Sequence, residues 1–279
     1  MTYDALGHGV LDYLPCRYGT SKLLFRGPRR HLDKTPYVAF VGGTETYGKF
    51  IEKPFPTLVE EQTGIAAANF GFPNAGIDVF AHDPFVTGAA SDAEVSVIQV
   101  MGAANMTNRF YSVHPRRNDR FVAASKLLMT IFREVDFAEF NYNKHMLCHL
   151  IQISPERFDA VRMELQEAWV ARMRLMLGQM RGKTILLWFA GHAPGTGACS
   201  ADDHAIGHDP LFITRDMMDE LREFATEVVE VTASKQAKAA GTDGMKFGEL
   251  EEPAAREMLG PQAHAEAADA ISQALGRLM

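Results

Sequence analysis

Short apolar segments alternate with helical patterns along the chain, and this alternation most strongly limits how it can fold. The segments cover residues 37–41, 65–72, 94–101 and 184–189, and a shorter one follows at 228–231. Each has the length of a strand, and residues 184–189 (TILLWF) are apolar almost throughout, which is typical of a strand buried on both faces. Strands separated by helices predict a parallel sheet that is covered on both sides. We therefore predict an α/β fold: a doubly wound parallel sheet sandwiched by helices in three layers.

The longest predicted helix covers residues 155–180. Ser154 can cap its start, Pro155 suits its first turn and Gly182 can end it. Apolar side chains recur at every third or fourth position of this segment, which predicts one stripe packed into the core. Other helices are predicted at residues 57–63, where Gly64 can end the helix, and at 120–135, 140–151, 216–226 and 261–278.

The domain organisation is predicted from the lengths of the connections. Residues 37–279 are predicted to form a single α/β domain, preceded by an N-terminal extension, residues 1–36, that packs on it or remains a solvated arm. Residues 105–183 are too long for a plain crossover after the third strand. They predict a helical insertion beside the strand ends, which serves as a lid or subdomain or else in dimerisation. Residues 101–121 show little apolar periodicity and are predicted to be a loop.

Composition excludes several classes of protein. A net charge of −7 argues against a general nucleic-acid binder, because no basic surface offsets phosphate repulsion. The three cysteines are widely spaced and odd in number, so they predict neither a disulfide framework nor a zinc cluster. No apolar run reaches the roughly 18 residues of a membrane span, and the first residues lack the pattern of a signal peptide. We expect a cytoplasmic protein without a membrane partner.

Residues 42–48 (GGTETYG) follow the first predicted strand directly. Glycines permit a tight turn there, and backbone N–H groups at a helix start favour anionic groups. The Thr44 hydroxyl is therefore a candidate nucleophile or anion ligand. The alternative is an ordinary strand–turn–helix connection in which Thr44 only caps the helix.

Three further blocks follow in chain order. Residues 69–76 (NFGFPNAG) end the second strand, residues 102–105 (GAAN) follow the third, and His264 lies on the apolar face of the first turn of the last helix. Together with residues 42–48, these blocks resemble the SGNH (GDSL-like) hydrolase superfamily. The chain is similar to a divergent member with Thr44 in place of the nucleophilic serine. The resemblance covers about residues 37–102 and 184–279.

This resemblance implies a hydrolase that acts on an ester, such as an O-acyl group of a carbohydrate. Thr44 would attack the carbonyl while His264 accepts its proton. Backbone N–H groups near Thr44 and Asn74, with the side chain of Asn105, would stabilise the oxyanion. Asn108 is a rival for the role of Asn105, because this block carries one extra residue.

The chain departs from the family pattern at several positions. The methyl group of Thr44 crowds the attack, and Gly43 replaces the usual aspartate. Asn74 replaces a glycine, although asparagine tolerates unusual backbone angles. Pro261 stands where an acid would orient His264, and losing that acid costs on the order of 10⁴ in a well-studied protease. The carboxylates that could replace it are Glu45, Asp78 and Glu257. A second hypothesis is therefore a catalytically degenerate protein that binds an anionic ligand.

An arginine-rich segment, residues 109–120 (RFYSVHPRRNDR), follows the third strand. Guanidinium groups hold carboxylate, sulfate or phosphate with two parallel hydrogen bonds, which predicts an anionic ligand such as an acidic polysaccharide, a phosphorylated sugar or a nucleotide donor. The alternative is that these arginines pair with Asp119, Glu134 and Asp136. A transferase with an anionic donor is a third possibility. The predicted substrate contacts are Gly43, Glu45, Gly71, Asn108, Arg116 and Arg120.

Metal and cofactor signals are weak. His145 and His149 are one helical turn apart but lack a third ligand, and the polar cluster at residues 201–208 shows no ligand spacing. Neither GxxxxGK[ST] nor GxGxxG occurs, so no metal and no nucleotide cofactor are predicted. The expected partner is a small molecule or carbohydrate, and self-association remains open.

Overall fold

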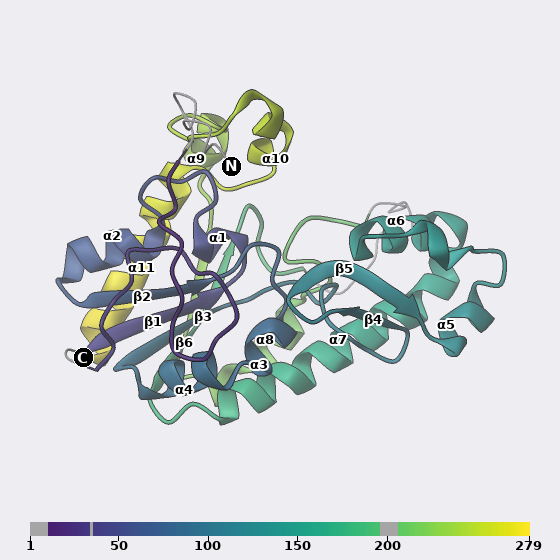
Figure 1. The fold of residues 1–279 in the computed structure, drawn as a ribbon, viewed down its shortest axis with the longest axis horizontal. Coiled ribbons are helices and arrows are strands. Elements are labelled where there is room, and N and C mark those ends of the chain that lie inside the picture. The colour runs from purple at the N-terminus through teal and green to yellow at the C-terminus, as the bar shows by residue number, and fades with distance from the viewer. Residues whose placement is uncertain (1–10, 34–35, 196–205) are drawn as a thin grey trace, which may run out of the picture.

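A five-stranded parallel sheet lies at the centre of the computed structural model, which describes residues 11–33, 36–195 and 206–279 (Figure 1). Its order is β2-β1-β3-β6-β7, and every neighbouring pair is parallel. The strands are β1 (Tyr37–Gly42), β2 (Ala66–Gly71), β3 (Val95–Gln99), β6 (Lys183–Ala190) and β7 (Glu227–Thr232). All five predicted strands are confirmed, with ends shifted by a few residues.

Helices cover both faces of this sheet, as predicted for a doubly wound fold. In Figure 1, α2 (Phe55–Thr63) and α11 (Pro261–Leu278) lie on one side, and α3 (Ile77–Ala81), α4 (Pro84–Asp92) and α7 (Pro155–Gly178) on the other. Successive side chains of a strand point to opposite faces. Val38 and Phe40 of β1 therefore join the core under α2 and α11, whereas Ala39 and Val41 join the core under α3, α4 and α7.

The capping residues behave as predicted at most helix ends. The Ser154 side chain accepts a hydrogen bond from Arg157 N at 3.3 Å and caps α7. Gly64 ends α2 with φ of 72°. Gln179, rather than Gly182, is the C-cap of α7. The remaining helices are α1 (Thr44–Tyr47), α5 (Lys126–Ile131), η1 (Phe137–Glu139), α6 (Asn143–Ile153), α8 (Arg215–Glu220), η2 (Arg222–Phe224), α9 (Lys235–Ala240), η3 (Glu249–Glu251) and α10 (Glu252–Arg256).

Two predictions for the segment after the third strand are wrong. Residues 111–124 form an antiparallel hairpin of β4 (Tyr111–His114) and β5 (Arg117–Ala124), not the predicted loop. The same hairpin occupies the start of the helix predicted at 120–135, and only α5 is helical within that range. Tyr111 and Val113 alternate with less buried neighbours along β4, but a period of two over only four residues is too short a signal to predict a strand.

The insertion of residues 105–183 divides its elements between two places. The hairpin, α5 and α6 extend to one side of the sheet, whereas α7 runs beneath it (Figure 1). Phe158, Leu165 and Trp169 of α7 are fully buried in the core, and Trp169 Nε1 donates to Met101 O at 2.8 Å. Within the described ranges, no helix combines the length and apolar character needed to cross a membrane.

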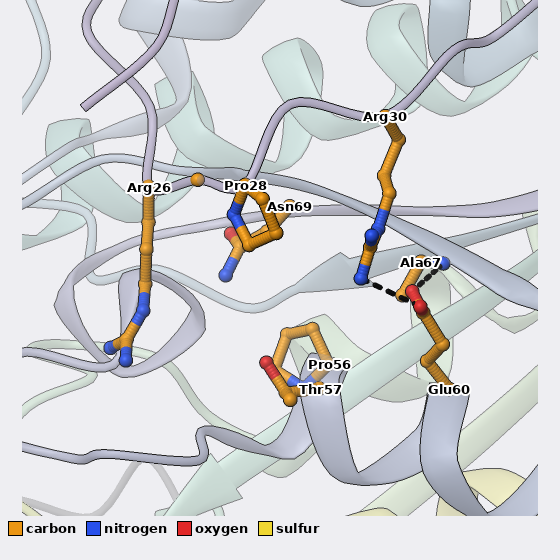
Figure 2. A pocket seen from close by; sticks show the side chains of 9 residues that line it. Arg26, Pro28, Arg30, Pro56, Thr57, Glu60, Ala67 and Asn69 are labelled. Carbon is orange, nitrogen blue, oxygen red and sulfur yellow. Dashed lines mark hydrogen bonds and ion pairs between the residues drawn. The ribbon is translucent and has the colours of Figure 1, made fainter. Parts of the chain in front are cut away.

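Two arginines bind the N-terminal segment to the loop after α1 and to α2. Arg26 is buried and donates to Gly48 O at 2.6 Å and to Glu52 O at 2.7 Å. Arg30 pairs with Glu60 at 2.6 Å, and Glu60 also accepts from Ala67 N at 2.7 Å (Figure 2). The cavity between these groups has a volume of about 20 Å³, which suffices for a single water molecule. This cavity is therefore too small to be a substrate site.

Candidate functional site

Gln99, the last residue of β3, stabilises the turn after β1 by hydrogen bonds. Gln99 Oε1 accepts hydrogen bonds from Gly43 N at 3.1 Å, Thr46 N at 3.2 Å and Thr46 Oγ1 at 2.5 Å. A Cβ atom on Gly42 would lie 2.2 Å from Thr46 Oγ1, so only glycine fits there. The N–H group of Gly43 points inward to Gln99. It is therefore not available for the substrate contact that was predicted for Gly43.

Thr44, Asn74 and Asn105 come together at the carboxyl edge of the sheet. Thr44 Oγ1 accepts a hydrogen bond from Asn74 N at 2.9 Å, and Asn105 Nδ2 donates to Asn74 O at 3.3 Å. Asn74 has φ of 55°, a left-handed conformation that asparagine tolerates better than most residues. The three predicted residues are therefore neighbours, but the donors of Asn74 and Asn105 already bond within the loops.

His264 does not pair with Thr44. Its side chain is 0% exposed, stacked on Phe55 with ring centroids 5.8 Å apart, and its Nδ1 accepts from Phe55 N at 3.2 Å. Its Nε2 lies 3.4 Å from Glu45 Oε2. Among the described residues the buried Nε2 has no hydrogen-bond partner, so its contact with Glu45 is not a hydrogen bond. Within the described residues no hydrogen bond joins His264 to Thr44, so the predicted reacting pair is not formed.

Glu45 is the carboxylate beside His264, among the three candidates. Its Oε1 also accepts from Leu259 N at 3.3 Å, so the side chain connects α1 to the segment before α11. Successive helical residues point about 100° apart. Glu45 therefore faces α11 while Thr44 faces the Asn74 loop. Asp78 pairs instead with Arg172 at 2.9 Å.

Two other predicted contacts have structural roles. A Cβ atom on Gly71 would lie 2.2 Å from Tyr47 N, so glycine is needed where β2 meets α1. Asn108 Oδ1 accepts from Phe110 N at 2.8 Å and Tyr111 N at 3.1 Å, which shapes the turn into β4. These two residues and Glu45 also lie outside the described lining of the cavity of about 390 Å³ that opens beside the arginine-rich hairpin.

The arginine-rich hairpin carries a bulge that faces this edge. His114 pairs with Arg117 and Val113 pairs with Phe121, so the three residues between Arg117 and Phe121 have no partner on β4. A bulge bends its strand and redirects side chains, and such bulges are over-represented next to active sites. The residues without a β4 partner are Asn118, Asp119 and Arg120, and Arg120 forms an isolated antiparallel bridge with Tyr142 instead.

A cavity of about 390 Å³ opens beside this bulge. Its polar and aromatic lining consists of Tyr47, Asn74, Arg117, Asp119, Arg120 and Tyr142. Leu24 of the N-terminal segment and Phe72 and Pro73 after β2 add apolar surface. The volume falls within the range typical of small-molecule sites, roughly 300–1,000 Å³. Burial raises the pKa of Tyr47 to about 12, so this residue lines the cavity as a neutral phenol.

The cationic groups of the cavity form no ion pair among the described residues, although Asp119 belongs to the same lining. Among the described residues, neither Arg117 nor Arg120 forms an ion pair, and the Arg120 guanidinium lies over the Tyr142 ring at 4.1 Å. Elsewhere in the insertion, by contrast, Arg109 pairs with Glu164 and Arg157 with Glu134. The alternative that all arginines of the segment serve ion pairs is therefore wrong for Arg117 and Arg120.

Arg116 and Arg117 are both exposed at the tip of the hairpin, but only Arg117 belongs to the described lining of the cavity. Arg117 takes the place that the sequence analysis gave to Arg116. Both residues lie at the turn between the strands, where Arg116 N and Arg117 N donate to His114 Nδ1 at 3.2 Å.

Two buried asparagines, missed by the sequence analysis, hold the hairpin against the sheet. Asn118 Oδ1 accepts from Gly76 N at 3.2 Å and Val79 N at 3.0 Å at the start of α3. Asn143 donates to Asn105 Oδ1 at 3.1 Å and also to Asn118 O. Both asparagines are 0% exposed. Their local sequence carries no distinctive signal, because each partner lies on a distant segment.

The candidate metal ligands have other surroundings. His145 and His149 both pack against the Phe140 ring, with centroids at 5.0 Å and 5.3 Å. In the described part of the chain, no group of three His, Cys, Asp or Glu side chains is placed to hold a metal ion. Residues 201–204 of the second cluster lie outside the described ranges.

Comparisons with known proteins give one family match and several distant structural similarities. A family model described as a domain of unknown function, DUF6473, matches residues 1–279. A search of curated proteins finds no match. A structure ascribed to the G-D-S-L lipolytic family, from Desulfitobacterium hafniense, is 13% identical, covers 87% of this chain and 99% of its own, and has a TM-score of 0.39. The lipase Lip_vut3 from a goat rumen metagenome is 13% identical, covers 88% of this chain and 100% of its own, and has a TM-score of 0.44. Likenesses this weak carry no argument about activity.

Proposed function

The chain belongs to the DUF6473 family, a domain of unknown function, and we propose that it binds a small anionic ligand at the carboxyl edge of its sheet. The ligand carries a phosphate, sulfate or carboxylate group. One observation carries this proposal: the guanidinium groups of Arg117 and Arg120 line a cavity of about 390 Å³ and have no acidic partner among the described residues.

The positive charges of Arg117 and Arg120 are not compensated by an ion pair among the described residues. With a net charge of −7, this protein has more than enough carboxylates to pair its arginines, and most described arginines outside the cavity are paired. Two guanidinium groups on one bulge provide several N–H donors in the fork geometry that matches an oxyanion. Tyr47 lines the same cavity without adding negative charge. An anion is therefore the ligand that this lining favours.

Isothermal titration with inorganic phosphate and with citrate tests the proposal. We expect the Arg117→Gln and Arg120→Gln variants each to bind the anion at least about tenfold more weakly, since a hydrogen bond to a charged group is worth roughly 1.5–3 kcal/mol. Arg116→Gln is the matched control, because it removes a neighbouring arginine that lies outside the cavity. Equal losses in all three variants, or no binding by the wild type, would contradict the proposal.

Ester hydrolysis at Thr44 is a second candidate function. The observation that favours it is the convergence of the Thr44 hydroxyl, Asn74 N–H and the Asn105 amide next to the cavity that Asn74 lines. Such a reaction needs a base other than His264, which is buried and bonded to other groups. A transferase with an anionic donor would use the same cavity and would depend on Arg120 but not on Thr44.

Hydrolysis of short-chain p-nitrophenyl esters tests this second candidate. For a Thr44 nucleophile, the Thr44→Val variant loses all activity, because valine keeps the shape of threonine without its hydroxyl. Thr44→Ser keeps the hydroxyl and relieves the crowding by the methyl group, so its activity stays equal or rises. Activity that persists in Thr44→Val rules out hydrolysis by this residue.

A further inference from the structure

The cavity contains one feature that a plain anion site does not need, the carboxylate of Asp119. This residue stands between Arg117 and Arg120 on the bulge and lines the same cavity. We infer that the ligand carries hydroxyl groups beside its anionic group, as a phosphorylated sugar does, and that Asp119 binds these hydroxyls. This inference rests on the anion site proposed above.

Asp119 has few bonding partners among the described residues of the protein. In the described part of the chain it forms no ion pair, although arginines flank it on both sides. Its described hydrogen bond is from Asn74 Nδ2 to Asp119 Oδ2 at 3.5 Å, at the limit for such a bond. Most of the acceptor capacity of this carboxylate therefore remains available to a ligand.

The negative charge of Asp119 affects which anions the cavity binds. A carboxylate in an anion site repels a ligand that offers only negative charge, which lowers its affinity. A ligand with hydroxyl donors turns the same carboxylate into an attractive partner, through hydrogen bonds in which the acceptor is charged. Asp119 thus discriminates between ligands by repulsion as well as attraction. Free phosphate and sulfate are disfavoured, and a hydroxylated anion is favoured.

The size of the cavity and its uncharged lining residues also suit a sugar. A cavity of about 390 Å³ has room for considerably more than the anionic group alone. Phe72, Pro73 and Leu24 give it apolar surface in addition to its charged residues, and Tyr47 adds an aromatic side chain. A sugar ring has hydroxyls at its edge and C–H groups on its faces, so it matches both kinds of surface.

Titration calorimetry with glucose 6-phosphate, phenyl phosphate and inorganic phosphate tests this inference. The two esters carry the same anionic group, but only the first carries hydroxyls. We expect the wild type to bind glucose 6-phosphate at least about tenfold more tightly than phenyl phosphate, the effect of one charge-assisted hydrogen bond. In the Asp119→Asn variant we expect this ratio to fall to about one, because the phenyl ester gains affinity and the sugar ester loses it.

The outcomes separate this inference from the proposed function. Phosphate binding that depends on Arg120, together with equal affinities for the two esters, overturns the role of Asp119 and leaves the anion site standing. A preference for the sugar ester that Asp119→Asn does not change also overturns it. Failure of all three compounds to bind overturns the anion site and this inference with it. Thermal melting of the isosteric variant verifies that it is folded.

Discussion

Replacing His264 with alanine is expected to lower the free energy of unfolding by about 3 kcal/mol, because the ring is fully buried between aromatic side chains. The change leaves a cavity beside Phe55 and Phe189. It also leaves Phe55 N without its acceptor and Glu45 without the facing imidazole, and buried groups that lose a partner add to the cost. Urea denaturation measures the difference.

Gln273→Ala is the matched control, since Gln273 is exposed on the same helix, α11. We expect this substitution to change the free energy of unfolding by less than about 0.5 kcal/mol. If His264→Ala kept the stability of the wild type and abolished ester hydrolysis, the structural role assigned to His264 would be wrong and a catalytic role would replace it.

Gly76→Ala is the second substitution with a large expected effect, a destabilisation of about 3 kcal/mol. The backbone of Gly76 has φ of −105°, which alanine readily adopts, so the cost is steric. An added Cβ atom would lie 1.7 Å from Asn105 O, a backbone atom that cannot rotate away. Because the Asn105 loop must move, we also expect weaker anion binding in the cavity beside Asn74. Urea denaturation and phosphate titration measure the two effects.

Gly43→Ala provides the control in the same part of the molecule. The nearest atom to a Cβ added at Gly43 is Met101 Cγ at 3.6 Å, an ordinary contact distance. We expect this substitution to lower the free energy of unfolding by at most about 1 kcal/mol, well below the loss for Gly76→Ala. Equal destabilisation by the two substitutions would show that the close approach of Gly76 to Asn105 is not the cause.

The sheet was predictable because its signals are local. A run such as residues 184–189 is apolar almost throughout, and only a strand buried on both faces suits it. The same holds for α7, whose cap at Ser154 and apolar stripe lie within one segment. The hairpin was not predictable in this way, because β4 is only four residues long and the bulge in β5 breaks the alternation along that strand.

The candidate site was predictable only in part. Thr44, Asn74 and Asn105 follow three strands that proved to be neighbours, and parallel strands bring such residues to one edge. His264 was correctly placed on the buried face of its helix, but that face meets α2 and Glu45 rather than Thr44. Periodicity shows which side of a helix is buried and does not show what it is buried against.

Local patterns in the chain were sufficient to predict the parallel sheet, the helices on its two faces and the polar residues at its carboxyl edge. Each of these follows from periodicity and turn chemistry within a short window. The position of Arg117 and Arg120 in a cavity lining that excludes Arg116, and the burial of His264 in the core, became visible only in the folded chain. These outcomes depend on a bulge held by buried asparagines and on the packing of α11 against α2, contacts between segments far apart in the chain.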